Sequence, residues 1–168
     1  MAIDAPAMAD WNAVIIREAT PMDADAISAL IHSLARWFLA DPGRPEDAAA
    51  FFETITPAAV ADALAGGRFR YHVAEADGVM VGVVGVREGR HLYHLFVAEP
   101  FHGRGIAGRL WAQARRVALE EGNPGEFTVN SSASAIPVYE RLGFVPTGEL
   151  QVQNGIAFLP MRLTIGPS

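Results

Sequence analysis

The hydrophobic pattern of the chain changes period between residues 91–97 and residues 106–117. The first stretch, HLYHLFV, is rich in aliphatic and aromatic side chains, which is typical of a β-strand. In the second stretch, apolar residues recur every three or four positions, which predicts an amphipathic helix. Glycine, asparagine and proline at 122–124 end that helix, because proline cannot continue it. The chain therefore passes from a strand into a long helix through a turn that contains several glycines.

The same patterns predict the remaining elements. Strands are expected at 12–19, 69–73, 79–86, 127–131, 144–152 and 156–165; helices are expected at 20–41, within 45–67 as two short helices or one kinked helix, and at 134–143 with Ser134 as its cap. Asp77-Gly78 and Asn154-Gly155 are typical of two-residue hairpin turns. This order predicts a mixed α/β fold around one sheet of about seven strands, flanked by about four helices.

Length, composition and charge narrow the class of protein. With 168 residues, we expect a loose N-terminal arm at 1–11 and a single domain at 12–168. The absence of cysteine excludes disulfides and cysteine-based nucleophiles or zinc sites. A formal net charge of −6 disfavours nucleic acid as a partner. Neither a signal peptide nor an apolar run of about 18 residues is visible, so we expect a cytoplasmic protein that does not cross a membrane.

Gly103, Gly105 and Gly108 lie between the predicted strand and the long helix. The first N–H groups of a helix have no intrahelical partners, and the helix dipole adds positive potential, so such a turn can bind phosphate. Glycine lets a diphosphate approach the backbone, because no Cβ stands in the way. The residues also match the dinucleotide fingerprint G-x-G-x-x-G, but five residues separate Val97 from Gly103 and no carboxylate follows the next strand. These departures disfavour NAD.

The order of elements and two motifs resemble the GNAT superfamily of acetyl-CoA-dependent N-acetyltransferases. The family motif Q/R-x-x-G-x-G/A stands here as HGRGIA at 102–107, with His102 in place of the usual Gln or Arg. The motif Y-E-x-L-G-F stands as YERLGF at 139–144. A family asparagine falls on Ser132, although Asn130 lies nearby. The resemblance implies the acyl-CoA N-acyltransferase fold, whose mixed sheet is mostly antiparallel.

The resemblance also implies where acetyl-CoA would bind. Its pyrophosphate would lie over the backbone N–H groups of 103–108, and its pantetheine arm would run along the backbone of 96–98. Arg104 or Arg109 would reach the adenosine 3′-phosphate, or else each is a solvated surface charge. The expected CoA-binding residues are Phe96, Val97, Ala98, His102, Gly103, Arg104, Gly105, Ile106, Ala107, Gly108, Arg109, Asn130 and Ser132. No metal is expected.

Three side chains are candidates for the chemistry. By the resemblance, Tyr139 would protonate the departing thiolate, since a phenol of pKa about 10 suits a thiolate of similar basicity. The alternative is a core tyrosine, because Ile136 shares its helix face. The Val97 N–H would donate to the oxyanion. His91 falls where some family members carry a glutamate base, and His94 is a second candidate that should point to the opposite face of the strand. A structural role for both histidines, with water as the base, is the alternative.

The sequence therefore predicts an N-acetyltransferase that moves the acetyl group of acetyl-CoA to a primary amine by direct attack. The missing cysteine agrees with a reaction that forms no acyl-enzyme. The acceptor would be a small-molecule amine or a peptide N-terminus, and a homodimer is a further assembly to test. The alternative function is a non-catalytic acyl-CoA-binding module of the same fold.

Overall fold

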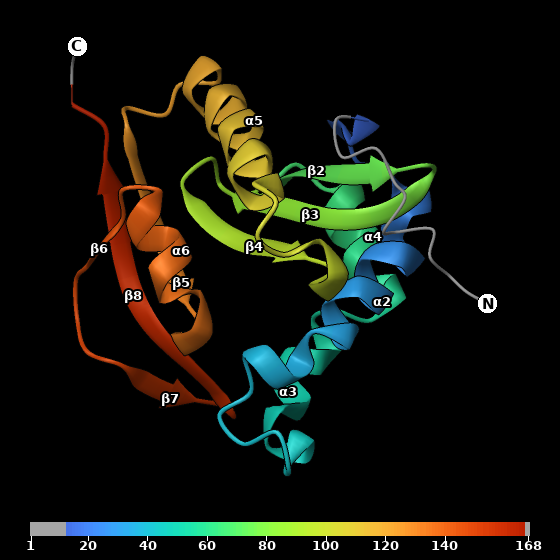
Figure 1. Ribbon diagram of the computed structural model, residues 1–168, viewed down its shortest axis with the longest axis vertical. Helices are drawn as coiled ribbons and strands as arrows, with labels where there is room; N and C mark the ends of the chain where they lie inside the picture. The colour runs from blue at the N-terminus through green and yellow to red at the C-terminus, as the bar shows by residue number, and fades with distance from the viewer. Residues whose placement is uncertain (1–12, 167–168) are drawn as a thin grey trace.

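The computed structural model describes residues 13–166 as a mixed α/β fold, and the predicted arm at 1–11 lies outside the described residues (Figure 1). The strands are β1 (Ile15–Glu18), β2 (Phe69–Ala76), β3 (Val79–Arg87), β4 (His91–Val97), β5 (Glu126–Ser131), β6 (Val145–Pro146), β7 (Gln151–Gln153) and β8 (Ile156–Thr164). They form one sheet in the order β1-β2-β3-β4-β5-β8-β6, with β7 paired to β8. Only the pair β4–β5 is parallel within this described sheet. The predicted mixed, mostly antiparallel fold is confirmed.

Two tight turns set the register of the hairpins. Asp77 and Gly78 have φ angles of 52° and 78°, and Asn154 and Gly155 have 53° and 75°. Positive φ at both central residues matches the right-handed twist of the flanking strands. The predicted strand at 144–152 is wrong, because the chain pairs only as β6 and β7, with a loop between them. Proline at the end of β6 has no N–H to extend the ladder.

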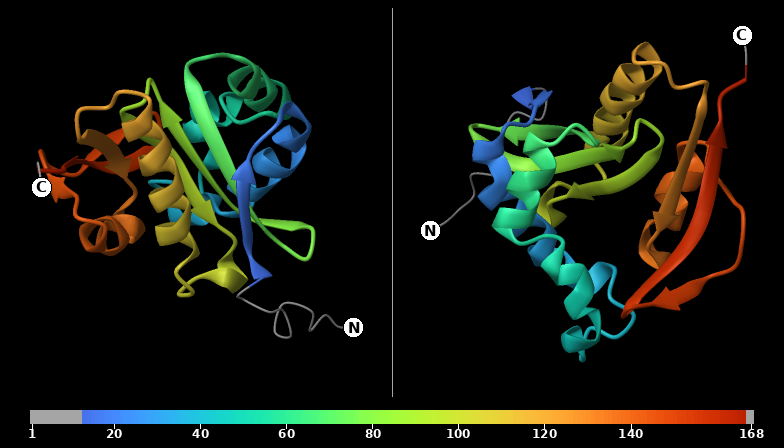
Figure 2. Two further views of the ribbon diagram at one scale, coloured as in Figure 1. Left: turned by 90° about the horizontal axis from the view of Figure 1, so that it is seen from above. Right: turned by 180° about the vertical axis from the view of Figure 1, so that it is seen from behind.

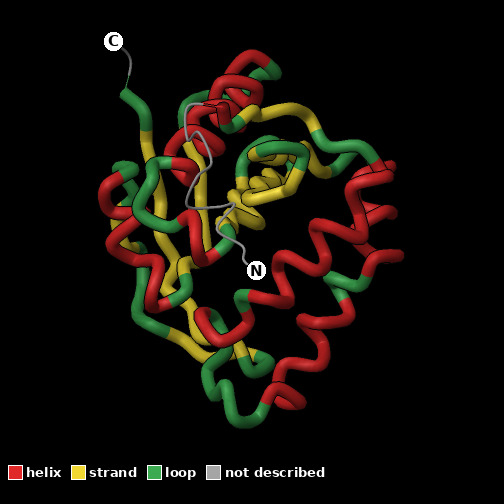
Figure 3. The backbone as a smooth tube through the Cα atoms, turned by 45° about the vertical axis from the view of Figure 1, so that its right-hand side comes forward, coloured by secondary structure: helices red, strands yellow, loops and turns green. Residues whose placement is uncertain are grey.

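Helices cover both faces of the sheet (Figures 2 and 3). They are α2 (Ala24–Ser33), α3 (Ala49–Glu53), α4 (Pro57–Ala65), α5 (Ile106–Glu120) and α6 (Ile136–Arg141). Leu110 of α5 is buried in the same core as Val84 of β3 and Phe127 of β5. On the opposite face, Ile27 of α2 is buried in a second core with Val83, the neighbour of Val84. Because neighbouring strand residues face opposite ways, β3 separates the two cores.

Residues 45–65 form a broken helical stretch beside α2. By length and composition alone, with a mean hydropathy of 1.2, the stretch Pro45–Ala65 could cross a membrane. In the fold α3 ends at Glu53 and α4 begins only at Pro57, so no continuous helix exists there. The side chains of Phe51 and Val60 pack in the core under α2. The prediction of two short helices is confirmed, whereas the absence of a membrane partner stays a prediction.

The sheet opens between β4 and β5. These two parallel strands pair only at His91 with Thr128 and at Leu92 with Val129. Beyond Leu92, β4 remains bonded to β3 on one edge, while β5 continues along β8. The other edge of β4 therefore has no strand partner among the described residues, and its backbone borders the gap. Unpaired strand edges of this kind accept an added extended chain.

A β-bulge in β4 changes which face His94 occupies. Gly85 of β3 pairs with His94 of β4, but the next residue, Val86, pairs with Leu92, so the register between the two strands shifts by one residue. Tyr93 is thus the extra residue, and its ring lies 4.2 Å from the His94 ring, so the two neighbours share one face. The prediction that His94 points away from His91 is therefore wrong: both line the same cavity. A bulge interrupts the alternation on which that prediction relied.

Candidate active site

The glycine turn presents open backbone at the start of α5. Gly103 and Gly105 have φ angles of 76° and 80°, a region that favours glycine, and Gly105 is the N-cap of α5. A Cβ built on Gly103, Gly105 or Gly108 would meet no other atom within 4 Å. The N–H of Arg109 makes the first intrahelical bond, to the Gly105 carbonyl. The N–H groups of Ile106, Ala107 and Gly108 therefore have no carbonyl partner within the helix, and the helix dipole favours an anion beside them.

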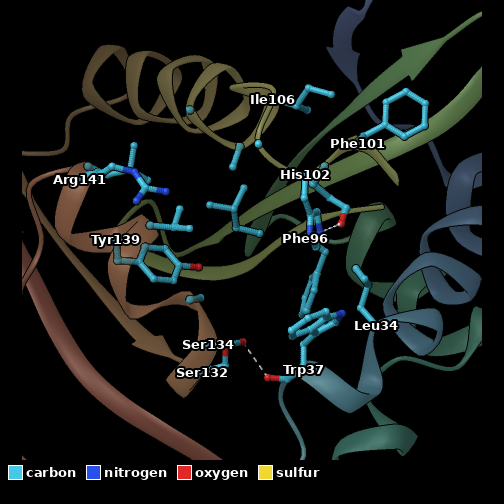
Figure 4. Close-up of a pocket in the computed structure, with 18 of the residues that line it drawn as sticks. Leu34, Trp37, Phe96, Phe101, His102, Ile106, Ser132, Ser134, Tyr139 and Arg141 are labelled. Carbon is cyan, nitrogen blue, oxygen red and sulfur yellow. Dashed lines mark hydrogen bonds between the residues drawn. The ribbon is translucent and has the colours of Figure 1, made fainter. Parts of the chain in front are cut away.

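A first cavity of about 430 Å³ extends from this turn into the gap between β4 and α6 (Figure 4). Its lining includes ten of the predicted CoA-binding and catalytic residues: Phe96, Val97, His102, Gly103, Gly105, Ile106, Ala107, Gly108, Ser132 and Tyr139. Ala98, Arg104 and Arg109 are not among its lining residues, and Asn130 lines a second cavity. The fold thus brings together most of a site that the sequence spreads over more than forty positions, from 96 to 139.

Arg109 is directed away from this cavity. Its Nη2 donates to the Val14 carbonyl at 2.9 Å, just before β1. Arg141 of α6 lines the cavity instead, and its guanidinium extends beside Tyr139 (Figure 4). Arg141 lies inside the YERLGF motif, but no sequence pattern marked it as a site residue. Arg141 therefore adds a cation to the lining of the cavity that also contains the glycine turn, whereas neither Arg104 nor Arg109 lines it.

His102 closes the loop against the end of β4. Its Nε2 lies 2.6 Å from the Val97 carbonyl oxygen. A carbonyl can only accept, so the imidazole nitrogen is the donor and carries a proton. The bond holds the glycine turn next to the unpaired edge of β4. It also uses one acceptor site of the backbone along which the pantetheine arm is expected to run.

Tyr139 projects from α6 into the middle of the first cavity (Figure 4). The side chain is buried, with its ring packed edge-on against Phe144 at 5.6 Å between centroids. Its hydroxyl makes no hydrogen bond to a described residue. Burial raises the pKa of Tyr139, so the phenol stays protonated at physiological pH. Tyr139 is therefore a core residue whose protonated hydroxyl group faces the cavity.

A second cavity of about 470 Å³ meets the first at six shared residues. The shared residues are Phe38, Leu95, Phe96, Ser132, Ala135 and Tyr139. The second cavity continues between the face of β4 that carries His91 and the turn that joins β7 to β8. Two molecules that entered from the two sides would thus meet beside Tyr139.

Both candidate histidines line the second cavity, and both are weak bases. Burial, followed by the charge of Arg87, lowers the pKa of His91 to about 4, while its Nδ1 contacts Thr128 Oγ1 at 2.8 Å. Burial alone lowers the pKa of His94 to about 3. Its Nδ1 lies 3.0 Å from the Tyr71 hydroxyl, and its Nε2 is buried without a hydrogen-bond partner. Both imidazoles are therefore neutral at pH 7.

Part of the site comes from a segment that no motif marks. Leu34, Trp37 and Phe38 follow α2 and line the first cavity. Leu34 and Trp37 lie across the cavity from Tyr139 (Figure 4). Ser134 Oγ donates to the Trp37 carbonyl at 3.0 Å, which links this segment to the turn before α6. The prediction of Ser134 as a helix cap is wrong, because Ser132 is the N-cap of the 3-10 turn that leads into α6. No group of three potential metal ligands occurs in the part of the chain that the structure describes.

These features define an α/β protein with a glycine turn at a helix N-terminus, beside a split sheet and a buried tyrosine. Residues 39–165 match the sequence profile of the family described as the acetyltransferase (GNAT) domain. The chain belongs to the GNAT superfamily of acetyltransferases. A curated acetyltransferase from Agrobacterium fabrum is 36% identical over 76 residues, a match that covers 44% of this chain and 56% of that protein. The chain thus spans little more than half the length of that relative.

Solved structures share the fold across almost the whole chain. A GCN5-related N-acetyltransferase from Rhodopseudomonas palustris has a TM-score of 0.74 and 23% identity, with 90% of this chain and 95% of that one covered. The PaiA N-acetyltransferase from Thermoplasma acidophilum, solved in complex with coenzyme A, has a TM-score of 0.73 and 14% identity, with 90% and 99% covered. At these identities the likeness shows the fold alone.

Proposed function

We propose that the protein transfers the acetyl group of acetyl-CoA to the nitrogen of a primary amine. The observation that carries this proposal is the position of Tyr139, whose side chain lines both cavities. One cavity begins at the open N–H groups of α5, which suit a diphosphate. The other extends from Tyr139 towards His91 and the turn that joins β7 to β8, and it suits a second substrate. The coenzyme A complex of the PaiA relative supports the assignment of the first cavity.

The backbone of this chain would hold acetyl-CoA in two ways. The first-turn N–H groups of α5 would donate to the pyrophosphate, and the glycines leave room for its oxygens. The unpaired edge of β4 would bind the pantetheine arm as an added strand, with His102 fixing the Val97 carbonyl. Arg141 would pair with a phosphate.

The side chains would then handle charge and protons. The neutral amine would attack the thioester carbon, and the N–H of Val97 would stabilise the resulting oxyanion. As the carbon–sulfur bond breaks, Tyr139 would give its proton to the thiolate. The ammonium form must lose a proton first. Because both histidines have low pKa values, we propose that water takes this proton, with His91 as a hydrogen-bond partner. The alternative, in which His91 or His94 is itself the base, stays a prediction.

A direct test is turnover with a panel of primary amines: free amino acids, polyamines, aminoglycosides and N-terminal peptides. Release of the CoA thiol that depends on both substrates, together with an N-acetylated product in the mass spectrum, is expected for at least one amine. Covalent acetylation of the protein itself is not expected. If no amine of any class is acetylated while CoA still binds tightly, the proposal of turnover is refuted.

That outcome would favour a non-catalytic acyl-CoA-binding module. The observation in favour of this second function is His102, which replaces the family's usual Gln or Arg and bonds to the Val97 carbonyl. If this bond blocks the pantetheine path, His102→Gln should tighten CoA binding. If it only braces the loop, the same substitution should leave the dissociation constant within about threefold.

A further inference from the structure

The second cavity is aromatic and contains one formal charge. Among the described residues that line it, Arg87 is the only charged side chain, and no carboxylate is present. Much of the wall is formed by the rings of Phe38, Phe51, Tyr93, Phe96, Tyr139 and Phe158. The backbone of Asp47 lies near the β7–β8 turn, but its carboxylate is 3.5 Å from Arg44. A substrate with a second ammonium group would find no counter-charge on this lining.

Arg87 is placed to bind an anion. Its guanidinium carbon lies 5.3 Å from the centroid of the Tyr93 ring, which fixes the group without using its hydrogen-bond donors. It makes no ion pair with any residue in the described part of the chain, 13–166. Arg87 also pairs directly with His91 across β3 and β4. A permanent cation and a neutral imidazole thus stand side by side on the wall of the second cavity.

We propose that the amine acceptor is a free amino acid with an aromatic or large aliphatic side chain, whose carboxylate binds Arg87. The guanidinium can grip a carboxylate with two parallel hydrogen bonds. The apolar side chain would lie against the phenylalanine rings, and the α-amino group would face Tyr139 and the first cavity. This inference rests on the proposed acetyl transfer, because it assigns the second cavity to the acceptor. It favours amino acids over polyamines, aminoglycosides and basic peptides.

The test compares L-phenylalanine with phenethylamine, which lacks only the carboxylate. For the wild-type chain, kcat/KM should be about ten- to a hundredfold higher for L-phenylalanine, since a charge-assisted pair is lost with the carboxylate. Arg87→Gln should reduce this preference to about twofold or less, and Arg87→Glu should reverse it. The dissociation constant of CoA should not change in either variant, because Arg87 does not line the first cavity.

Arg90→Gln is the matched control. It removes one positive charge from the same β3–β4 hairpin, but Arg90 is exposed and does not line the second cavity. This variant should keep the wild-type preference. Binding of L-phenylalanine in the presence of CoA, measured by calorimetry, separates the two proposals. Arg87-dependent binding without turnover would overturn acetyl transfer and leave the carboxylate site standing. Equal or better turnover of phenethylamine by the wild type would overturn the carboxylate site and leave acetyl transfer standing.

Discussion

Tyr139→Phe removes one hydroxyl group and little else. The ring would keep its edge-on packing against Phe144, at 5.6 Å between centroids. The hydroxyl makes no hydrogen bond to a described residue, so its loss strands no buried partner, and the free energy of unfolding should change by less than about 0.5 kcal/mol. A group that matters little for stability can thus be tested for catalysis alone.

The expected loss is in kcat. General acids contribute about a hundred- to ten-thousandfold, and water in an open cavity can replace part of this, so we expect kcat to fall about ten- to a thousandfold. The ratio corresponds to about 1.4–4 kcal/mol of transition-state stabilisation. The assay is steady-state thiol release at saturating amine, with the dissociation constant of CoA measured by calorimetry and expected to stay nearly the same. Because burial raises the pKa of Tyr139, the phenol should not limit kcat on the alkaline side below its ordinary titration range.

Phe144→Leu is the control for packing. Phe144 is buried and contacts the Tyr139 ring, but it lines neither cavity. The substitution should cost about 1–2 kcal/mol of stability and leave kcat within about threefold of the wild type. The reasoning would be refuted if Tyr139→Phe kept the wild-type kcat, or if Phe144→Leu lost as much activity as Tyr139→Phe. Either result would make Tyr139 a core residue without a role in proton transfer.

Three further variants test other parts of the site. Gly108→Ala should raise stability by about 0.5–1 kcal/mol through helix propensity. It should nevertheless weaken CoA binding at least tenfold, because the added methyl group would occupy the open space where the pyrophosphate is expected to bind. Normal CoA affinity would count against the turn as the pyrophosphate site. Arg141→Gln should weaken CoA binding about three- to thirtyfold without lowering kcat at saturation, whereas Arg115→Gln, an exposed control on α5, should have no effect. His94 has a pKa of about 3 in the folded chain, below its value of 6.5 in the unfolded chain. Below pH 6.5 the unfolded chain therefore binds a proton that the folded chain does not, so the free energy of unfolding is highest above pH 6.5 and falls as the pH falls towards 3. His94→Gln should therefore flatten the loss of stability in acid by up to about 1.4 kcal/mol per pH unit, and an unchanged slope in denaturant titrations would contradict the buried neutral histidine.

The sequence by itself determined most of the elements, the glycine turn before α5 and the position of Tyr139. Local conformational preferences are enough to specify the Asp77-Gly78 and Asn154-Gly155 turns, because both need positive φ at adjacent positions. Local preferences also specify the glycine turn before α5, because the positive φ angle of its N-cap, Gly105, favours glycine independently of the surrounding packing. The YERLGF motif identified Tyr139 through family resemblance, although the helix pattern alone also fitted a core residue.

Only the tertiary structure decided which other side chains line the cavities around the glycine turn and Tyr139. No sequence pattern marked Trp37, which lines the first cavity from the segment after α2. Arg109 follows the glycine motif directly, yet its side chain turns away from the cavity to the Val14 carbonyl. The bulge at Tyr93 turned His94 onto the face of His91, since one extra residue reverses the alternation of a strand. Periodicity describes each element in isolation, whereas the cavity lining depends on contacts between elements far apart in the chain. Those contacts exist only after β4 and β5 have separated and α6 has packed against the gap.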